Sequence, residues 1–124
     1  MGSPTAGAVT ITSTGATAAI WQVVEFSGVD TSGTNGSGAI VQTEPHRGTG
    51  TDVTSLSTLF DAPVGGSNAA YAAVGIHSVQ ETMTAGSGWT ALGQATVTGP
   101  QSSMIGMFAN PAQQAITASW TTST

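Results

Sequence analysis

The stretch Ala18-Ala19-Ile20-Trp21-Gln22-Val23-Val24-Glu25-Phe26 is rich in β-branched and aromatic residues, and many of its apolar side chains recur at a spacing of two. One face of the extended chain would carry Ala18, Ile20, Val24 and Phe26, and the other face Trp21 and Val23. A strand that is apolar on both faces is typical of the middle of a sheet, where both faces are covered. The stretch therefore predicts a central, buried β-strand in an all-β protein.

The rest of the sequence has the same character of short strands separated by turns. The 17 Gly and 5 Pro disfavour helices, as do the abundant Thr and Val. Further strands are expected near residues 9–12, 39–43, 55–60, 69–77, 89–97, 102–109 and 115–121. Residues 55–59 also admit one helical turn, because Val53, Leu56 and Leu59 recur at a spacing of three. About eight strands predict an antiparallel, jelly-roll-like β-sandwich that forms one domain over residues 1–124.

Charged side chains are scarce, and this argues against several classes of partner. Only 6% of the residues are charged, the net charge is -5, and Arg47 is the only Lys or Arg. Such a chain cannot neutralise a row of phosphates or bind an anionic lipid surface, so we expect no nucleic-acid partner. No apolar run approaches the roughly 20 residues of a membrane span, so no membrane insertion is expected. The chain has no Cys, so its core must hold the fold without disulfides.

The two ends of the chain carry similar segments. Residues 8–12 read Ala-Val-Thr-Ile-Thr and residues 115–119 read Ala-Ile-Thr-Ala-Ser, so apolar residues alternate with hydroxyl residues in both. If both segments take the same structural position of a repeating unit, one copy is surplus within a single sandwich. The fold is then permuted, or the surplus strand pairs with the exposed edge of a neighbouring subunit.

Candidate binding residues lie in a polar loop. Glu44, His46 and Arg47 flank Pro45, and they form either an interface contact or a solvated loop that carries the one basic side chain. As a catalytic set they lack a placed nucleophile, and as a metal site they lack ligands at a recognised spacing. We therefore predict no catalytic residues, no metal and no cofactor, and the chain is not expected to be an enzyme.

The three tryptophans divide into two groups. Trp21 and Trp120 have apolar neighbours and are expected in the core. Trp89 follows Gly86-Ser87-Gly88 and is the candidate for stacking on a sugar ring, provided that its ring is exposed.

A run of apolar residues near the C-terminus covers both faces of one expected strand. Met104, Met107 and Phe108 bracket Gly106 in that strand. The pattern indicates either a central strand or a strand whose outer face is covered by a partner.

Two phrases of the sequence carry a resemblance to a known family. Residues 21–30 read W-Q-V-V-E-F-S-G-V-D and residues 87–93 read S-G-W-T-A-L-G. Both resemble signature stretches of β-sandwich modules found in bacteriophage virion proteins and in bacterial surface or secreted proteins. The chain departs from that pattern at its end, where the family continues into another tryptophan-containing strand. The resemblance implies a β-sandwich and assigns no catalytic residue.

Composition and resemblance together favour a structural role. We expect a non-enzymatic module of a bacteriophage virion, as a capsid decoration or tail-associated protein, that forms homo-oligomers and contacts other virion proteins through strand edges and apolar faces. The alternative is a carbohydrate-binding or adhesion module of a bacterial surface or secreted protein, with a glycan as its ligand. Either role places the chain on a virion surface or in the extracellular space.

Overall fold

Strands form only after residue 53 of the described chain. The computed structural model describes residues 8–12, 14–15, 18–34, 37–46, 53–99 and 101–122. Its strands are β1 (Ser55–Leu59), β2 (Ala70–His77), β3 (Thr84–Ala85), β4 (Thr90–Thr98), β5 (Gln101–Ala109) and β6 (Ala115–Ser119), and a single 3-10 turn, η1 (Ser37–Ala39), precedes them. The described residues include no helix that is long and apolar enough to cross a membrane.

The strands form two antiparallel sheets of three strands each. The order is β1-β6-β3 in one sheet and β2-β5-β4 in the other. β5 pairs with β2 from Ala70↔Ala109 to His77↔Ser102, and it pairs with β4 through an irregularity between Ala91 and Gly93. β6 and β5 are therefore the central strands, and each sheet has an open edge on both sides within the described part of the chain.

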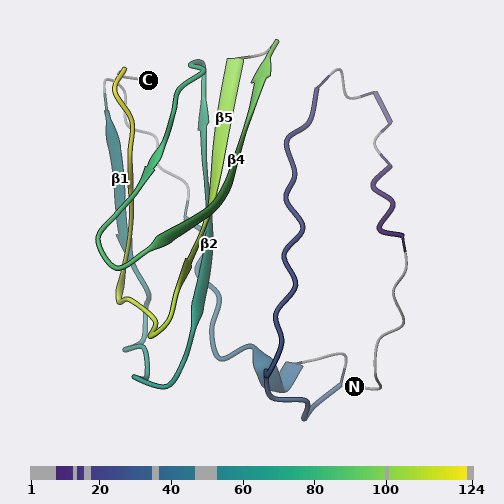
Figure 1. The fold of residues 1–124 in the computed structure, drawn as a ribbon, viewed down its shortest axis with the longest axis vertical. Coiled ribbons are helices and arrows are strands. Elements are labelled where there is room, and N and C mark those ends of the chain that lie inside the picture. Colours follow the sequence, from purple (N-terminus) through teal and green to yellow (C-terminus); the bar gives the residue numbers. More distant parts are fainter. Residues whose placement is uncertain are drawn as a thin grey trace.

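The core lies between the two sheets, as expected for a β-sandwich (Figure 1). β2 alternates strictly between buried and exposed residues, so that one face of the strand contributes Ala70, Ala72, Val74 and Ile76. Ile105 and Met107 of β5 are almost fully buried, and Ile116 and Ala118 of β6 close the core from the other sheet. Burying a side chain the size of Ile or Met stabilises the fold by about 1.5–3 kcal/mol.

The predicted strand count is corrected by the structure, which has six strands rather than about eight. Residues 55–59 are a strand, as expected, but the expected strands near 9–12, 18–26 and 39–43 do not form. Trp21, expected in the core, is 60% exposed. The alternation of apolar and polar residues in these segments indicates a local preference for extended backbone. A β-strand also needs a neighbouring strand with which to form backbone hydrogen bonds.

Glutamine side chains hold several connecting segments to the sheets. Gln94 accepts a hydrogen bond from the Met83 backbone N–H at 2.9 Å and donates one to the Glu81 carbonyl at 2.9 Å. Gln42 bonds to both backbone groups of Ala62, at 3.1 and 3.2 Å. An amide offers a donor and an acceptor, so one side chain can satisfy two backbone groups as a paired strand would. The loops are thereby fixed without ion pairs.

Candidate functional site

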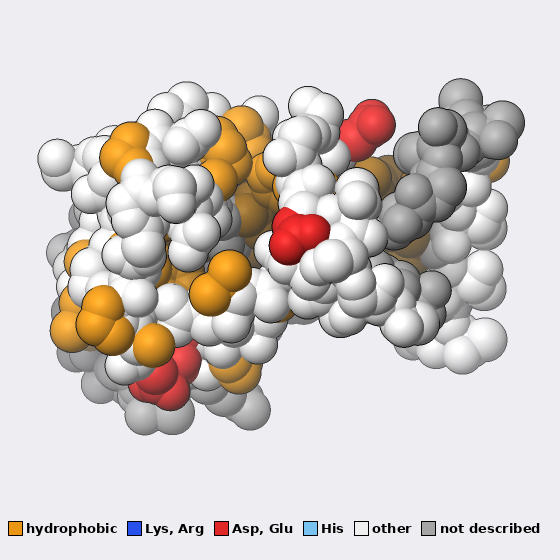
Figure 2. Space-filling model, turned by 90° about the horizontal axis from the view of Figure 1, so that it is seen from below, with side chains coloured by type: hydrophobic (Ala, Val, Ile, Leu, Met, Phe, Trp, Pro, Cys, Tyr) orange, Lys and Arg blue, Asp and Glu red, His pale blue; other side chains and the backbone are white. Residues whose placement is uncertain are grey.

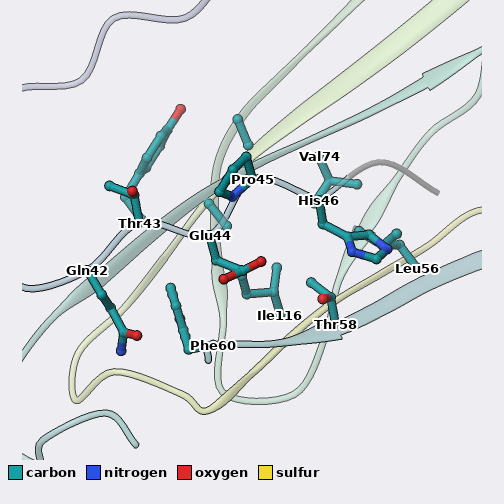
Figure 3. Close-up of a pocket in the computed structure, with 13 residues that line it drawn as sticks. Gln42, Thr43, Glu44, Pro45, His46, Leu56, Thr58, Phe60, Val74 and Ile116 are labelled. Carbon is teal, nitrogen blue, oxygen red and sulfur yellow. The ribbon is translucent and has the colours of Figure 1, made fainter. Parts of the chain in front are cut away.

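A groove of about 370 Å³ lies between the edge strands β1 and β2. Its floor is apolar and comes from both sheets, with Leu56 of β1, Val74 of β2 and Ile116 of β6, together with Phe60 just after β1. Residues 42–46 form its other wall (Figure 3). The groove is thus the side of the sandwich where neither sheet continues and the core approaches the surface.

Two of the predicted contact residues line this groove. Glu44 is half-buried and His46 is exposed, and Figure 3 shows the carboxylate of Glu44 near Ile116 and Phe60, with the imidazole of His46 beside Leu56 and Thr58. Arg47, the third predicted contact, lies outside the described residues. The groove therefore offers hydrogen-bonding groups above an apolar floor, an arrangement suited to an extended peptide or another amphipathic partner.

The wall that carries Glu44 and His46 is placed by the amide of Gln42. The two hydrogen bonds between Gln42 and Ala62 tie this segment to the chain just after β1. Pro45 then restricts the backbone between the two polar side chains. Among the described residues, no group of three His, Cys, Asp or Glu side chains lies close enough to hold a metal ion.

Trp89 belongs to the core rather than to a binding surface. Its side chain is only 7% exposed, and its indole N–H donates a hydrogen bond to the Ala115 carbonyl at 2.8 Å. A ring buried in this way has no open face for a sugar to stack on, which corrects the proposed role of Trp89 as a contact. Trp120 is also buried, as predicted, and donates to the Val53 carbonyl at 3.1 Å.

A second contact surface, which the sequence did not reveal, is the outer face of the β2-β5-β4 sheet. Residues 18–26 cross this face as an extended segment (Figure 1). The Tyr71 hydroxyl donates to Oε1 of Gln22 at 3.0 Å, and the ring of Phe26 lies 6.0 Å from that of Tyr71 and 5.7 Å from that of Phe108. The segment is held by side chains and not by a backbone ladder.

Gly106 of β5 allows residues 18–26 to lie close to the outer face of the sheet. A Cβ added to Gly106 would overlap the amide of Gln22, so a larger residue in the middle of β5 would displace that side chain. A glycine within a strand often marks a place where another part of the chain comes close. Gly106, noted in the sequence only as the residue between two methionines, was the available signal for this surface.

Large apolar side chains are exposed mainly in the N-terminal third of the chain. Exposed residues in this part include Val9, Ile11, Trp21, Val23, Phe26, Ile40 and Val41. Figure 2 shows one face of the molecule, on which acidic side chains lie apart from one another and apolar ones reach the surface between uncharged polar groups. Concentrated apolar exposure of this kind marks contact surfaces in soluble proteins.

Two carboxylates, those of half-buried Glu81 and exposed Asp30, have shifted pKa values with a local cause. The Thr121 hydroxyl donates to Oε2 of Glu81 at 2.6 Å and lowers the pKa of that carboxyl below its usual 4.5. The Ser32 backbone N–H donates to Oδ1 of Asp30 at 2.8 Å and lowers the pKa of Asp30 in the same way. Both shifts follow from hydrogen bonds to the charged form. The first hydrogen bond joins Glu81 to Thr121, and the second lies within the turn at Asp30.

The chain matches no protein-family model, no curated protein and no solved structure. The family resemblance of residues 21–30 and 87–93 therefore gains no support from these comparisons. Function is therefore inferred from the groove and from the exposed apolar surfaces.

Proposed function

We propose that this chain is a non-enzymatic structural module that assembles with further copies of itself and with other proteins of a bacteriophage virion. The observation that carries the proposal is the N-terminal third of the chain. Apart from η1 and several bends, its described residues form no helix or strand, and they expose large apolar side chains. In an isolated subunit such a segment leaves apolar surface exposed to water. Burying this surface against a neighbouring subunit would lower the free energy through the hydrophobic effect.

The open sheet edges support the same proposal. β1, β2, β3 and β4 each have one side without a strand partner among the described residues. Proteins usually protect such edges with charged residues, especially Lys. This chain contains a single Lys or Arg in 124 residues, so neighbouring subunits that cover the edges would supply the protection that lysines give in other proteins.

Sedimentation of the purified chain over a wide range of concentration tests the proposal. We expect a defined oligomer that changes little between low and high salt, because apolar and backbone contacts are not screened as surface ion pairs are. A chain that stays monomeric at every concentration would overturn the proposal. The virion partner would be identified by adding the labelled chain to purified phage particles, where saturable binding is expected.

A carbohydrate-binding role is the second candidate, and one observation favours it. Exposed Trp21 borders a shallow hollow of about 130 Å³, which is also lined by the amide residues Gln22 and Gln94. An open aromatic ring beside amide groups is a suitable arrangement for stacking on a sugar ring. Because Trp89 and Trp120 are buried, a saccharide that changes the tryptophan fluorescence would report on Trp21. Binding that persists in a Trp21→Ala variant would remove this candidate.

A further inference from the structure

We propose that residues 8–12 of one copy add as a strand to the free edge of β1 in a second copy and place Val9 and Ile11 in the groove between β1 and β2. This inference rests on the proposed function, since it names the segment and the surface through which copies assemble. It accounts for three features of the chain: the sequence match between its two ends, the open edge of β1, and the apolar groove beside that edge.

The sequence match identifies the surface. Residues 115–119, which resemble residues 8–12, form β6, and β6 is the strand that pairs with β1. In β6, Ile116 and Ala118 face the core and are buried, whereas Thr117 and Ser119 do not. Aligned on this strand, Val9 and Ile11 take the inward positions, and Thr10 and Thr12 take the outward ones. Residues 8–12 thus have the same alternation as β6, which pairs with one edge of β1. The other edge of β1 is the one proposed for residues 8–12.

The free edge of β1 has a place for these inward side chains. β1 is the end strand of its sheet, with β6 on one side and no strand on the other within the described chain. Leu56 and Thr58, the half-buried residues of β1, line the groove together with Val74 of the opposite sheet. A strand added at this edge alternates its side chains between solvent and groove, so Val9 and Ile11 would lie above an apolar floor.

Val9 and Ile11 have no comparable environment within their own subunit. Their side chains are 66% and 53% exposed. Figure 1 places residues 8–12, drawn in purple, across residues 18–26 from the sandwich, on the side of the molecule opposite β1. Gln22 and Phe26 hold residues 18–26 on the outer face of the β2-β5-β4 sheet. This arrangement keeps the segment away from the β1 of its own chain and presents it to a second copy.

The polar wall of the groove is compatible with an uncharged strand. Glu44 and His46 line the groove, and the imidazole of His46 lies beside Leu56 and Thr58 of β1 (Figure 3). Residues 8–12 carry no charge that would be left unpaired beside them. Thr10 and Thr12 would face outward and remain solvated. Backbone hydrogen bonds to β1 would then supply affinity, and the two apolar side chains would supply register.

A pair of matched variants tests the inference by light scattering on the full chain. Val9→Asp/Ile11→Asp places carboxylates on the inward face and is expected to raise the dissociation constant of the assembly by about a hundredfold or more. Thr10→Asp/Thr12→Asp adds the same charge on the outward face, and this variant should assemble much more strongly than the first. Circular dichroism checks that both variants keep the sandwich.

The outcomes separate this inference from the proposed function. Suppose that the unmodified chain assembles but that assembly of the two variants is weakened equally or not at all. The pairing of residues 8–12 with β1 is then wrong, and the copies assemble through another surface. If the unmodified chain never assembles, the proposed function fails and this inference fails with it.

Disulfide trapping shows whether the strand comes from another copy. The chain has no Cys, so a chain carrying Ile11→Cys can be mixed with a chain carrying Thr58→Cys under mild oxidation. A disulfide between the two chains is expected, and Thr10→Cys, which faces outward, is the matched control that should react more slowly. If a single chain carrying both Ile11→Cys and Thr58→Cys instead closes an internal disulfide and stays monomeric, the partner is not a second copy and the inference is overturned.

Discussion

Replacing Gly106 by Ala tests how residues 18–26 are held on the outer face of the β2-β5-β4 sheet. The added Cβ would overlap the amide of Gln22, so this side chain must leave its place beside Tyr71. The rest of β5 has no reason to change, because Ala fits an extended strand better than Gly does. Gly75, on the neighbouring strand β2, is a matched control, since a Cβ there meets nothing closer than the Ser103 carbonyl at 3.9 Å.

The expected energies have opposite signs at the two positions. Gly to Ala in a strand stabilises by about 0.5–1 kcal/mol through the lost freedom of the unfolded chain, and Gly75→Ala should show this gain. Gly106→Ala has the same gain but loses the Gln22–Tyr71 hydrogen bond, which contributes about 0.5–1.5 kcal/mol. It also loosens the contacts of Phe26 with Tyr71 and Phe108, each contributing about 0.5–1.5 kcal/mol beyond burial. If all three contacts are lost, the net result is a loss of about 0.5–4 kcal/mol.

Chemical denaturation of the four chains in a double-mutant cycle measures this difference. The variants are Gly106→Ala, Gln22→Ala and the combination of the two, compared with the unmodified chain. Once Gln22 is shortened the added methyl has room, so the double variant should be no less stable than Gln22→Ala alone. If Gly106→Ala is as stable as Gly75→Ala, residues 18–26 do not dock on this face and the reasoning is refuted.

Three further predictions concern the core and one carboxylate. Met107→Ala, at a fully buried position, should lower the free energy of unfolding by about 2–5 kcal/mol. Met104→Ala, on the outer face of the same strand, should lower it clearly less. Equal losses would contradict the assignment of the two faces. Trp89→Phe should cost about 1–3 kcal/mol by leaving the partly buried Ala115 carbonyl without its indole donor, as measured by denaturation. Glu81 should titrate below 4.5 in an NMR experiment, and Thr121→Val should move its pKa back up. Because that pKa is lowered on folding, the associated stability is present above 4.5 and is lost as the pH falls through the folded value.

Five of the six strands could be predicted from the sequence, whereas the two-residue strand β3 was not predicted. In β2 the alternation of Ala72, Val74 and Ile76 with more polar or smaller residues matched the buried face. β5 was apolar on both sides, and the structure explains this by its central position and by the contact of Phe108 with Phe26. In both cases local pattern and tertiary environment agree.

The same pattern misled in residues 18–26 because alternation does not specify a partner. Ile20, Trp21 and Val23 have the composition of a central strand, yet Trp21 and Val23 are exposed. Such a segment joins a sheet only if an unpaired strand edge lies within reach. The position of that edge depends on the whole fold or on a neighbouring subunit, so the local sequence does not show it. The groove at Glu44 and His46 was anticipated as a contact, but its apolar floor comes from three strands far apart in the sequence, so sequence proximity could not reveal it.

The scarcity of charge connects the internal structure with the proposed assembly. Inside the chain, the amides of Gln42, Gln94 and Gln114 fix loops that ion pairs would often fix in other proteins; Gln114 donates to the Phe60 carbonyl at 2.7 Å and accepts from the Val64 N–H at 3.0 Å. Neutral contacts of this kind are not weakened by salt. The same lack of charge leaves the strand edges without the lysines that normally prevent edge-to-edge pairing. In the assembly proposed above, a neighbouring subunit would protect these edges. Residues 8–12 have the alternation of β6 and no strand partner within the described chain, so they have the pattern of a strand that could supply this protection.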